Sequence, residues 1–200
     1  DYPVPVWTLP AVDFSEEGAV AKASEAFSFN VDTADLLAAI DAPFEVPTTP
    51  YAFQYSLLGK AKADRKTIVL PEGEEDRIIK AADYLLERDV VDLIIVGDEN
   101  AILARGEELG LKSLSKAKFQ AMDDEEVLTP MVAKLCELRA KKGMTEDQAR
   151  KQLTDASYFG TMLVVLGLAD GLVSGSVNST ANTVRPALQV IKTKPEIGRA

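Results

Sequence analysis

A polar segment over residues 175–186 holds the residue types best suited to chemistry. It follows an apolar, strand-like run over 170–175 and reads Gly-Ser-Val-Asn-Ser-Thr-Ala-Asn-Thr-Val-Arg-Pro. We expect a helix to begin near Val184 with Pro186 in its first turn, where the missing N–H of proline costs nothing. Backbone N–H groups and the positive end of the dipole converge at such a helix start and favour an anion.

The side chains of this segment fit the same interpretation. Arg185 can make a forked, permanently charged contact with an anion. Four hydroxyl side chains add donors: Ser176, Ser179, Thr180 and Thr183. The pattern lacks the glycine-lysine-hydroxyl ending of a nucleotide-triphosphate loop and the three glycines of a dinucleotide fingerprint. An ordinary strand-to-helix connection capped by Ser, Thr and Asn would explain these residues equally well.

The composition narrows the chemistry open to the chain. It contains no histidine, which excludes Ser-His-Asp and Cys-His arrangements and imidazole metal sites. The single cysteine, Cys136, excludes an internal disulfide and argues against a structural zinc site. We expect no metal and no cofactor, so catalysis or binding must use carboxylates, hydroxyls, arginines, lysines and backbone dipoles.

Charge and hydropathy bound the partners and the compartment. A net charge of -10 argues against nucleic acid, which needs a dense basic surface, but permits a small anionic ligand at a local site. The longest apolar stretch, 162–169, is too short to span a bilayer, and no signal-like leader opens the chain. With only one cysteine as well, we expect a cytoplasmic protein without membrane partners.

Residues 51–200 carry the alternating pattern of an α/β fold. Nearly all-apolar strands are typical of a parallel sheet covered by helices on both faces, which is the fold class predicted here. The strands are expected at 67–70, 92–96 and 172–174. The helices are expected at 52–62, 75–88, 100–109, 125–142, 145–153 and 157–168.

The first part of the chain is richer in proline than the rest. Five of the ten prolines lie between Pro3 and Pro47, and a sixth is Pro50. A short strand is expected at 4–9, a helix capped at Ser15 and running towards Phe27, and a second helix at 32–40. The prolines that follow predict a linker, with a domain boundary within 47–51.

Several ordered motifs resemble the phosphate acetyl- and butyryltransferase family. The clearest match is the segment from Asp170 to Gly175 together with that from Thr180 to Gln189, which resembles the signature of this family. Supporting matches are TIVLPEG at 67–73 with Asp76-Arg77, Glu137-Leu138-Arg139 with Lys142-Gly143-Met144-Thr145, and Val190-Ile191-Lys192-Thr193. The resemblance implies that 49–200 is the truncated N-terminal part of the catalytic domain, forming the first lobe of a two-lobed fold. Residues 1–48 would be the end of an upstream domain plus a Pro-rich linker, as in the long form of this enzyme.

The resemblance also implies a function and a site. Family members move an acetyl group between coenzyme A and inorganic phosphate, with coenzyme A as a substrate, and we expect the full-length protein to form a homo-oligomer. Arg139 and Arg185 match two family arginines associated with substrate binding, although Arg139 taken alone fits a solvated charge near a helix end. The loop over 176–183 matches the family's anion-binding loop. The expected substrate-binding residues are Arg139, Ser176, Asn178, Ser179, Thr180, Thr183 and Arg185.

Two departures from the family pattern matter. Asn178 stands where many members carry a histidine, so an amide must do whatever that side chain does. The family's catalytic serine and aspartate lie in a later segment that nothing here matches, and Asp170 does not match that aspartate. We therefore expect this chain alone to be inactive. The alternatives are phosphate butyryltransferase, a non-catalytic acyl-CoA-sensing module, and a structural module with a vestigial loop.

The acidic cluster after the first strand has a simpler interpretation. Glu72, Glu74, Glu75 and Asp76 are expected to form a solvated helix start that the helix dipole favours.

Overall fold

A computed structural model describes residues 9–41 and 49–193. The chain divides into two compact units, Asp1–Thr49 and Pro50–Ala200, which are described separately. The division falls within the proline-rich segment that ends at Pro50.

The described part of the first unit forms two helices, α1 (Ala19–Asn30) and α2 (Thr33–Asp41). The expected capped start at Ser15 is wrong, because Ser15 bonds Asp13 in a turn and α1 follows Gly18, whose φ is 79°. Helix α2 begins close to the expected place, since the Asp32 carboxylate accepts the backbone N–H of Ala34 at 2.7 Å. The strand expected at 4–9 falls almost entirely outside the described residues, and Leu9 has no regular structure.

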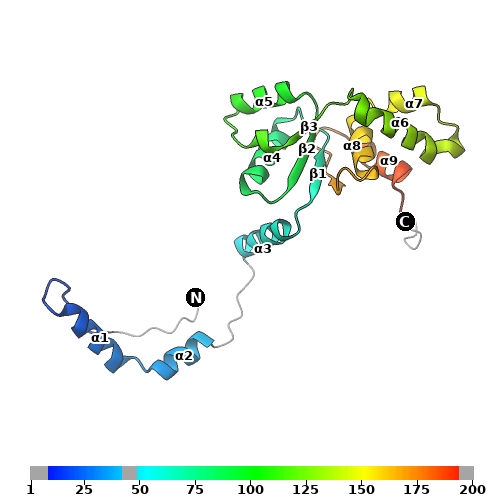
Figure 1. The fold of residues 1–200 in the computed structure, drawn as a ribbon. Coiled ribbons are helices and arrows are strands. Elements are labelled where there is room, and N and C mark those ends of the chain that lie inside the picture. The colour runs from blue at the N-terminus through cyan, green and yellow to red at the C-terminus, as the bar shows by residue number, and fades with distance from the viewer. Residues whose placement is uncertain (1–8, 42–48, 194–200) are drawn as a thin grey trace. The chain divides into compact units, whose positions relative to one another are not determined.

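The second unit is built on a parallel sheet with strand order β3-β2-β1-β4 (Figure 1). Strands β1 (Thr67–Leu70) and β2 (Asp92–Val96) have the predicted bounds. Strand β4 is the pair Gly171–Leu172, one residue earlier and one shorter than expected. Strand β3 (Lys118–Gln120) was not predicted.

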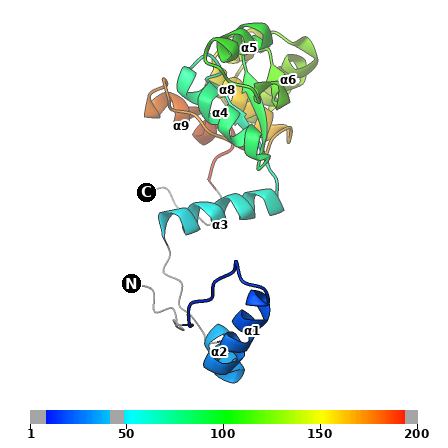
Figure 2. The same ribbon diagram turned by 90° about the vertical axis from the view of Figure 1, so that its left-hand side faces the viewer.

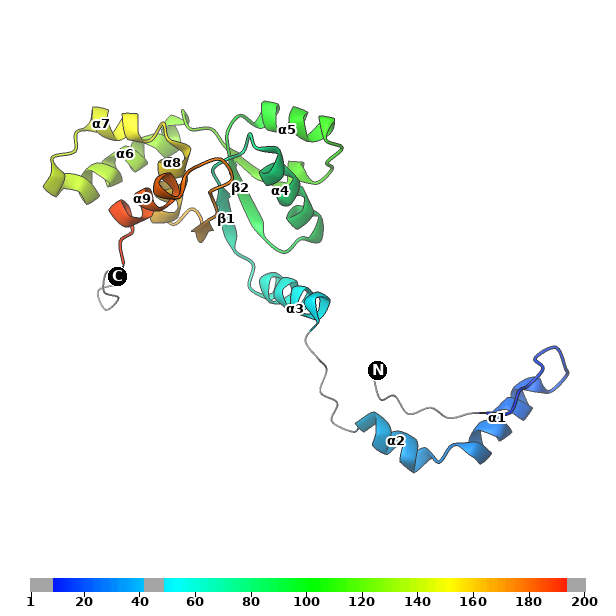
Figure 3. The same cartoon turned by 180° about the vertical axis from the view of Figure 1, so that it is seen from behind.

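Helices cover both faces of the sheet, as the apolar strands predict. The helical elements after β1 are α4 (Asp76–Arg88), α5 (Glu99–Glu108), η1 (Leu114–Lys116), α6 (Glu125–Arg139), η2 (Ala140–Lys142), α7 (Glu146–Gln152), α8 (Ala156–Val165) and α9 (Thr180–Val190). Val69, Ile94 and Val96 pack into a core cluster with side chains of α6, α8 and α9. Their neighbours in the strands, Leu70 and Ile95 among them, pack with side chains of α4 and α5 on the other face. Seen from behind, α6 to α9 and α4 with α5 lie on opposite sides of the sheet (Figure 3).

Local capping explains most helix boundaries. The predicted capping box of α7 is present, with Thr145 and Gln148 exchanging hydrogen bonds between side chain and backbone. The expected stop after α6 is present at Gly143, whose φ of 68° is in the left-handed region.

Helix α9 begins earlier than predicted. Ser179 caps it by accepting the N–H of Asn182 at 3.3 Å, so the first helical residue is Thr180. Pro186 is therefore the seventh residue of the helix and is buried, not part of the first turn. The cap determines the start of this helix, and the proline costs one hydrogen bond inside it.

Helix α3 (Pro50–Ala63) precedes the layered part of this unit and has no buried residue. Its Gln54 makes a hydrogen bond to α4, in which the side-chain Nε2 donates to the hydroxyl of Tyr84 at 3.0 Å. Figure 2 shows this helix outside the two helical layers.

Candidate functional site

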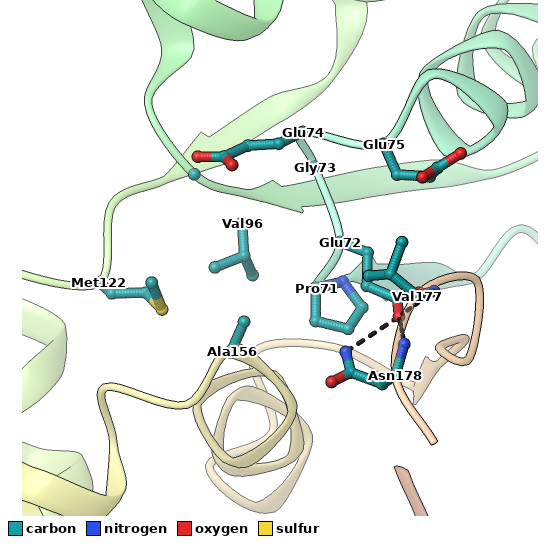
Figure 4. A pocket seen from close by; sticks show the side chains of 11 residues that line it. Pro71, Glu72, Gly73, Glu74, Glu75, Val96, Met122, Ala156, Val177 and Asn178 are labelled. Carbon is teal, nitrogen blue, oxygen red and sulfur yellow. Dashed lines mark hydrogen bonds between the residues drawn. The ribbon is translucent and has the colours of Figure 1, made fainter. Parts of the chain in front are cut away.

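The carboxyl ends of the four parallel strands surround a pocket of about 360 Å³ (Figure 4). Segments that follow each strand contribute to it, as expected for a ligand site in an open parallel sheet. The loop after Gly175 lies at this carboxyl edge, because β4 runs parallel to β1. The lining residues are Pro71, Glu72, Gly73, Glu74, Glu75, Val96, Gly97, Met122, Ala156, Val177 and Asn178.

Glu72 is the centre of this arrangement. Its Oε2 accepts the backbone N–H groups of Gly175 at 3.0 Å and Ser176 at 2.8 Å. Its Oε1 accepts the backbone N–H groups of Val177 at 3.0 Å and Asn178 at 2.9 Å, and the Asn178 side-chain amide at 2.9 Å. Five donors thus converge on one carboxylate that is only 6% exposed. Figure 4 shows Asn178 facing Glu72 across this contact.

The hydrogen bonds keep Glu72 charged despite its burial. Burial alone would raise the pKa of this carboxyl. The N–H groups of Ser176, Val177 and Asn178 and the Asn178 amide outweigh burial and lower the pKa from 4.5 to about 2. The expectation that Glu72 is solvated is wrong for this reason. A signal was present in the sequence, since Glu72 comes just after a buried strand, at the edge where the polar loop also lies.

This contact corrects the predicted use of the loop. The N–H groups of residues 175–178 do not point to an external anion, because Glu72 already accepts all of them. Ser176 is further fixed by its carbonyl, which accepts Arg77 Nη2 at 2.9 Å. Asn178 uses its amide to donate to Glu72, which is the role that this side chain has here. Among the described residues, the hydroxyl donors left for a ligand are that of Ser176, whose contacts with Glu72 and Arg77 use only its backbone, and those at the start of α9.

The remaining hydroxyls lie on the first turns of α9. Ser179 is the helix cap and Thr180 is exposed at its first position. Thr183 Oγ1 is buried and has no hydrogen-bond partner among the described residues. It lies beneath the turn at Gly175, where a Cβ atom would come within 3.8 Å of it. Gly175 has a φ of 114°, so the turn itself favours glycine.

The two predicted arginines lie on neighbouring helices. Arg185 is exposed on α9, beside a shallow hollow of about 370 Å³ that also includes Val184 and Leu188. Arg139 is half-buried at the end of α6, and its Nε has no hydrogen-bond partner in the described part of the chain. Helices α6 and α9 contact each other. The structure thus groups Ser176 with Asn178 on Glu72, places Ser179, Thr180, Thr183 and Arg185 along α9, and leaves Arg139 on α6.

The turn that carries Glu72 is fixed by close packing. A Cβ atom on Gly73 would collide with the Val96 carbonyl oxygen and come within 2.7 Å of Ile95. Only glycine therefore lets this turn approach the end of β2. Glu75 then caps α4 and pairs with Arg77 at 2.7 Å, and Asp76 pairs with Arg105 at 2.7 Å. With Glu72, three of the four carboxylates predicted to be solvated therefore have specific partners.

Other candidates have structural positions. The carboxylate of Asp170 lies at the amino end of the sheet and accepts the Thr67 N–H at 2.8 Å. Cys136 is half-buried and packs against the core of the α6 side. Within 9–41 and 49–193, no group of three His, Cys, Asp or Glu residues could hold a metal ion, and no helix could cross a membrane.

The fold and this edge define an α/β protein with a candidate ligand site at the carboxyl ends of parallel strands. Comparison with known families gives a match to phosphate acetyl/butaryl transferase over residues 52–200. The chain therefore belongs to the phosphate acetyl/butyryltransferase family.

Individual relatives agree with this membership. Phosphate acetyltransferase of Nitratidesulfovibrio vulgaris is 41% identical over 86% of this chain and 24% of its own length. The enzyme of that name from Corynebacterium glutamicum is 45% identical over 72% of this chain and 44% of its length. A EutD phosphotransacetylase from Staphylococcus aureus superposes with a TM-score of 0.68 and 41% identity. A phosphotransacetylase from Streptococcus pyogenes superposes with a TM-score of 0.71 and 37% identity. Each structural match covers 76% of this chain and 46% of the other, so the chain spans less than half of these relatives.

Proposed function

We propose that the full-length protein containing this chain is a phosphate acetyltransferase. It converts acetyl-CoA and inorganic phosphate to coenzyme A and acetyl phosphate, and catalyses the reverse reaction. The observation that carries this proposal is the set of relatives named phosphate acetyltransferase that match most of this chain at 40–45% identity. Coenzyme A is a substrate here, no cofactor takes part, and the protein acts in the cytoplasm as a homo-oligomer.

In this proposal the chain supplies substrate-binding groups. The phosphate is held by Arg185 and by the hydroxyls of Ser179, Thr180 and Thr183. These side chains take the role first expected of the loop N–H groups. Thr183 Oγ1 has no hydrogen-bond partner among the described residues, so it is free to donate to a ligand once the turn at Gly175 that covers it gives way. Arg139, with an unpartnered Nε, binds an anionic part of coenzyme A or the phosphate. Ser176 and Asn178 act through Glu72, to which both donate.

The reaction proposed is a direct transfer without a covalent enzyme intermediate. A phosphate oxygen attacks the thioester carbonyl, the new C–O bond forms, the C–S bond breaks, and the thiolate leaves. In reverse, the thiolate attacks acetyl phosphate. The site contributes positioning and charge stabilisation, and the base that generates the thiolate lies in a segment outside this chain.

An activity assay on the full-length protein tests the proposal. Acetyl-CoA and phosphate should give free thiol and acetyl phosphate in equal amounts, and omission of phosphate should stop thiol release. Faster reaction with butyryl-CoA would instead identify a phosphate butyryltransferase. Binding of acetyl-CoA without turnover would identify an acyl-CoA-sensing module and contradict the proposal.

A further inference from the structure

The connection between β4 and α9 depends on few local contacts. Strand β4 is only two residues long, and after it the Val173 N–H donates to the Val69 carbonyl at 3.0 Å. The body of α9 is held by the buried Pro186 and Val190, and by Gln189, which accepts the Tyr158 hydroxyl at 2.9 Å. The first turn of α9 is exposed. Residues 175–178 lie between these two anchored parts, and their N–H groups all bond Glu72.

We infer that Glu72 is a positioning residue, whose carboxylate holds residues 175–178 in the conformation that sets the first turn of α9 and its phosphate-binding groups. The claim that this loop positions phosphate-binding groups rests on the proposed function. The claim that Glu72 fixes the conformation of the loop rests on the five hydrogen bonds alone. Glu72 touches no reacting group in this role. It acts through the loop, and through the loop on Ser179 and Thr180 directly after it.

The geometry requires a carboxylate at this position. Each of the two oxygens accepts at least two N–H groups, which only a carboxylate can do on both sides. In Glu72→Gln, the side-chain NH₂ would face two or more backbone N–H donors, and those donors would lose their acceptor. Glu72→Asp keeps both acceptor oxygens but withdraws them by about 1.5 Å, the length of one C–C bond.

Hydrogen exchange on the 200-residue chain tests whether Glu72 fixes the conformation of residues 175–178. In Glu72→Gln, the amides of residues 175–178 should exchange about ten- to hundredfold faster, as expected for the loss of charged hydrogen bonds. Amides of Ile94 and Ile95 in the central strand open only on global unfolding, so they should accelerate by no more than the loss in the free energy of unfolding allows. Glu72→Asp should give a smaller acceleration confined to the same loop, and provides the test if Glu72→Gln does not fold. Glu107→Gln, which removes an exposed carboxylate on α5, is the matched control and should change neither region.

Steady-state kinetics of the full-length protein test the consequence for the reaction. Glu72→Gln should raise KM for phosphate about tenfold with little change in kcat, because the phosphate-binding turn is misplaced in a folded enzyme. A lower kcat with unchanged KM would mean only a loss of folded protein and would overturn the positioning role. Unchanged loop exchange would overturn it as well, whatever the kinetics. An inactive wild-type protein would overturn the proposed function and the link to phosphate, and this outcome is distinguishable because the exchange experiment needs no activity.

Discussion

The same two strands, β1 and β4, are joined by a carboxylate at each end of the sheet, but the two ends differ in burial. At the amino edge, Asp170 is exposed and accepts the single N–H of Thr67 at 2.8 Å. At the carboxyl edge, Glu72 is 6% exposed and accepts five donors from residues 175–178. The bonds are similar in length, so the difference between the two edges lies in access to water.

The free energy lost when each contact is removed depends on how far water can reach the carboxylate. An exposed carboxylate that loses its partner is hydrated instead, and the loss is small. A buried carboxylate can stay charged only with a full set of donors, and those donors in turn depend on it. Loss of the contact at the amino edge should therefore cost little free energy. Loss of the contact at the carboxyl edge, next to the pocket, leaves buried polar groups without partners and should cost more. The more buried contact lies at the carboxyl edge, where ligands of open parallel sheets bind.

The largest expected effect concerns activity. The purified 200-residue chain should show no thiol release from acetyl-CoA and phosphate above a buffer control, while the full-length protein turns over. The carboxyl edge described here supplies binding groups, and the proposed base lies elsewhere. Activity of the chain alone, measured as consumption of acetyl phosphate, would show that this edge is a complete active site.

Stability should separate the two carboxylates. Glu72→Ala leaves several buried N–H groups without an acceptor, so the free energy of unfolding should fall by about 2–4 kcal/mol. Asp170→Ala removes one exposed hydrogen bond and should cost less than about 1 kcal/mol. Urea denaturation of both variants and the wild type measures this. Equal losses would remove the distinction between the two edges.

A second contrast compares Arg185 of α9 with an arginine at the amino edge. Arg185→Lys in the full-length protein should weaken the use of phosphate by about ten- to a hundredfold, or ~1.5–3 kcal/mol, because an ammonium cannot reproduce the planar fork. Arg65→Lys is the matched control at the amino edge, where Arg65 pairs with Asp89 and Asp92 in exposed ion pairs. It should leave the kinetics unchanged. If Arg185→Lys keeps normal kinetics or unfolds the protein, Arg185 has a structural role.

The pH dependence of stability gives a further test of the carboxyl edge. The pKa of Glu72 is lowered from 4.5 to about 2 in the folded state, so its stabilising contribution is fully present above pH 4.5 and is lost as the pH falls towards 2. The Glu72→Gln variant lacks this contribution at every pH. Its free energy of unfolding should therefore approach that of the wild type between pH 4.5 and 2, as followed by urea denaturation at a series of pH values. A gap that is constant across this range would mean that Glu72 has an ordinary pKa.

The sequence by itself determined the layered fold. Strands β1 and β2 could be placed because each is a continuous apolar run, which a parallel sheet buries on both faces. Helix α7 could be placed because its capping box is local to Thr145 and Gln148. Strand β3 could not, because Lys118-Phe119-Gln120 pairs on one side only, at the edge of the sheet, and shows no apolar run.

The candidate site was predicted in part. The segment from Gly175 to Arg185 stands out in the sequence, because its glycine, hydroxyls and arginine follow a strand and precede a helix. Only the tertiary structure decided what its N–H groups bind. Their acceptor, Glu72, lies more than a hundred residues earlier and reaches them because β4 pairs with β1 in the sheet. Local patterns encode caps and strands, but which loops meet at one edge depends on the order of the strands.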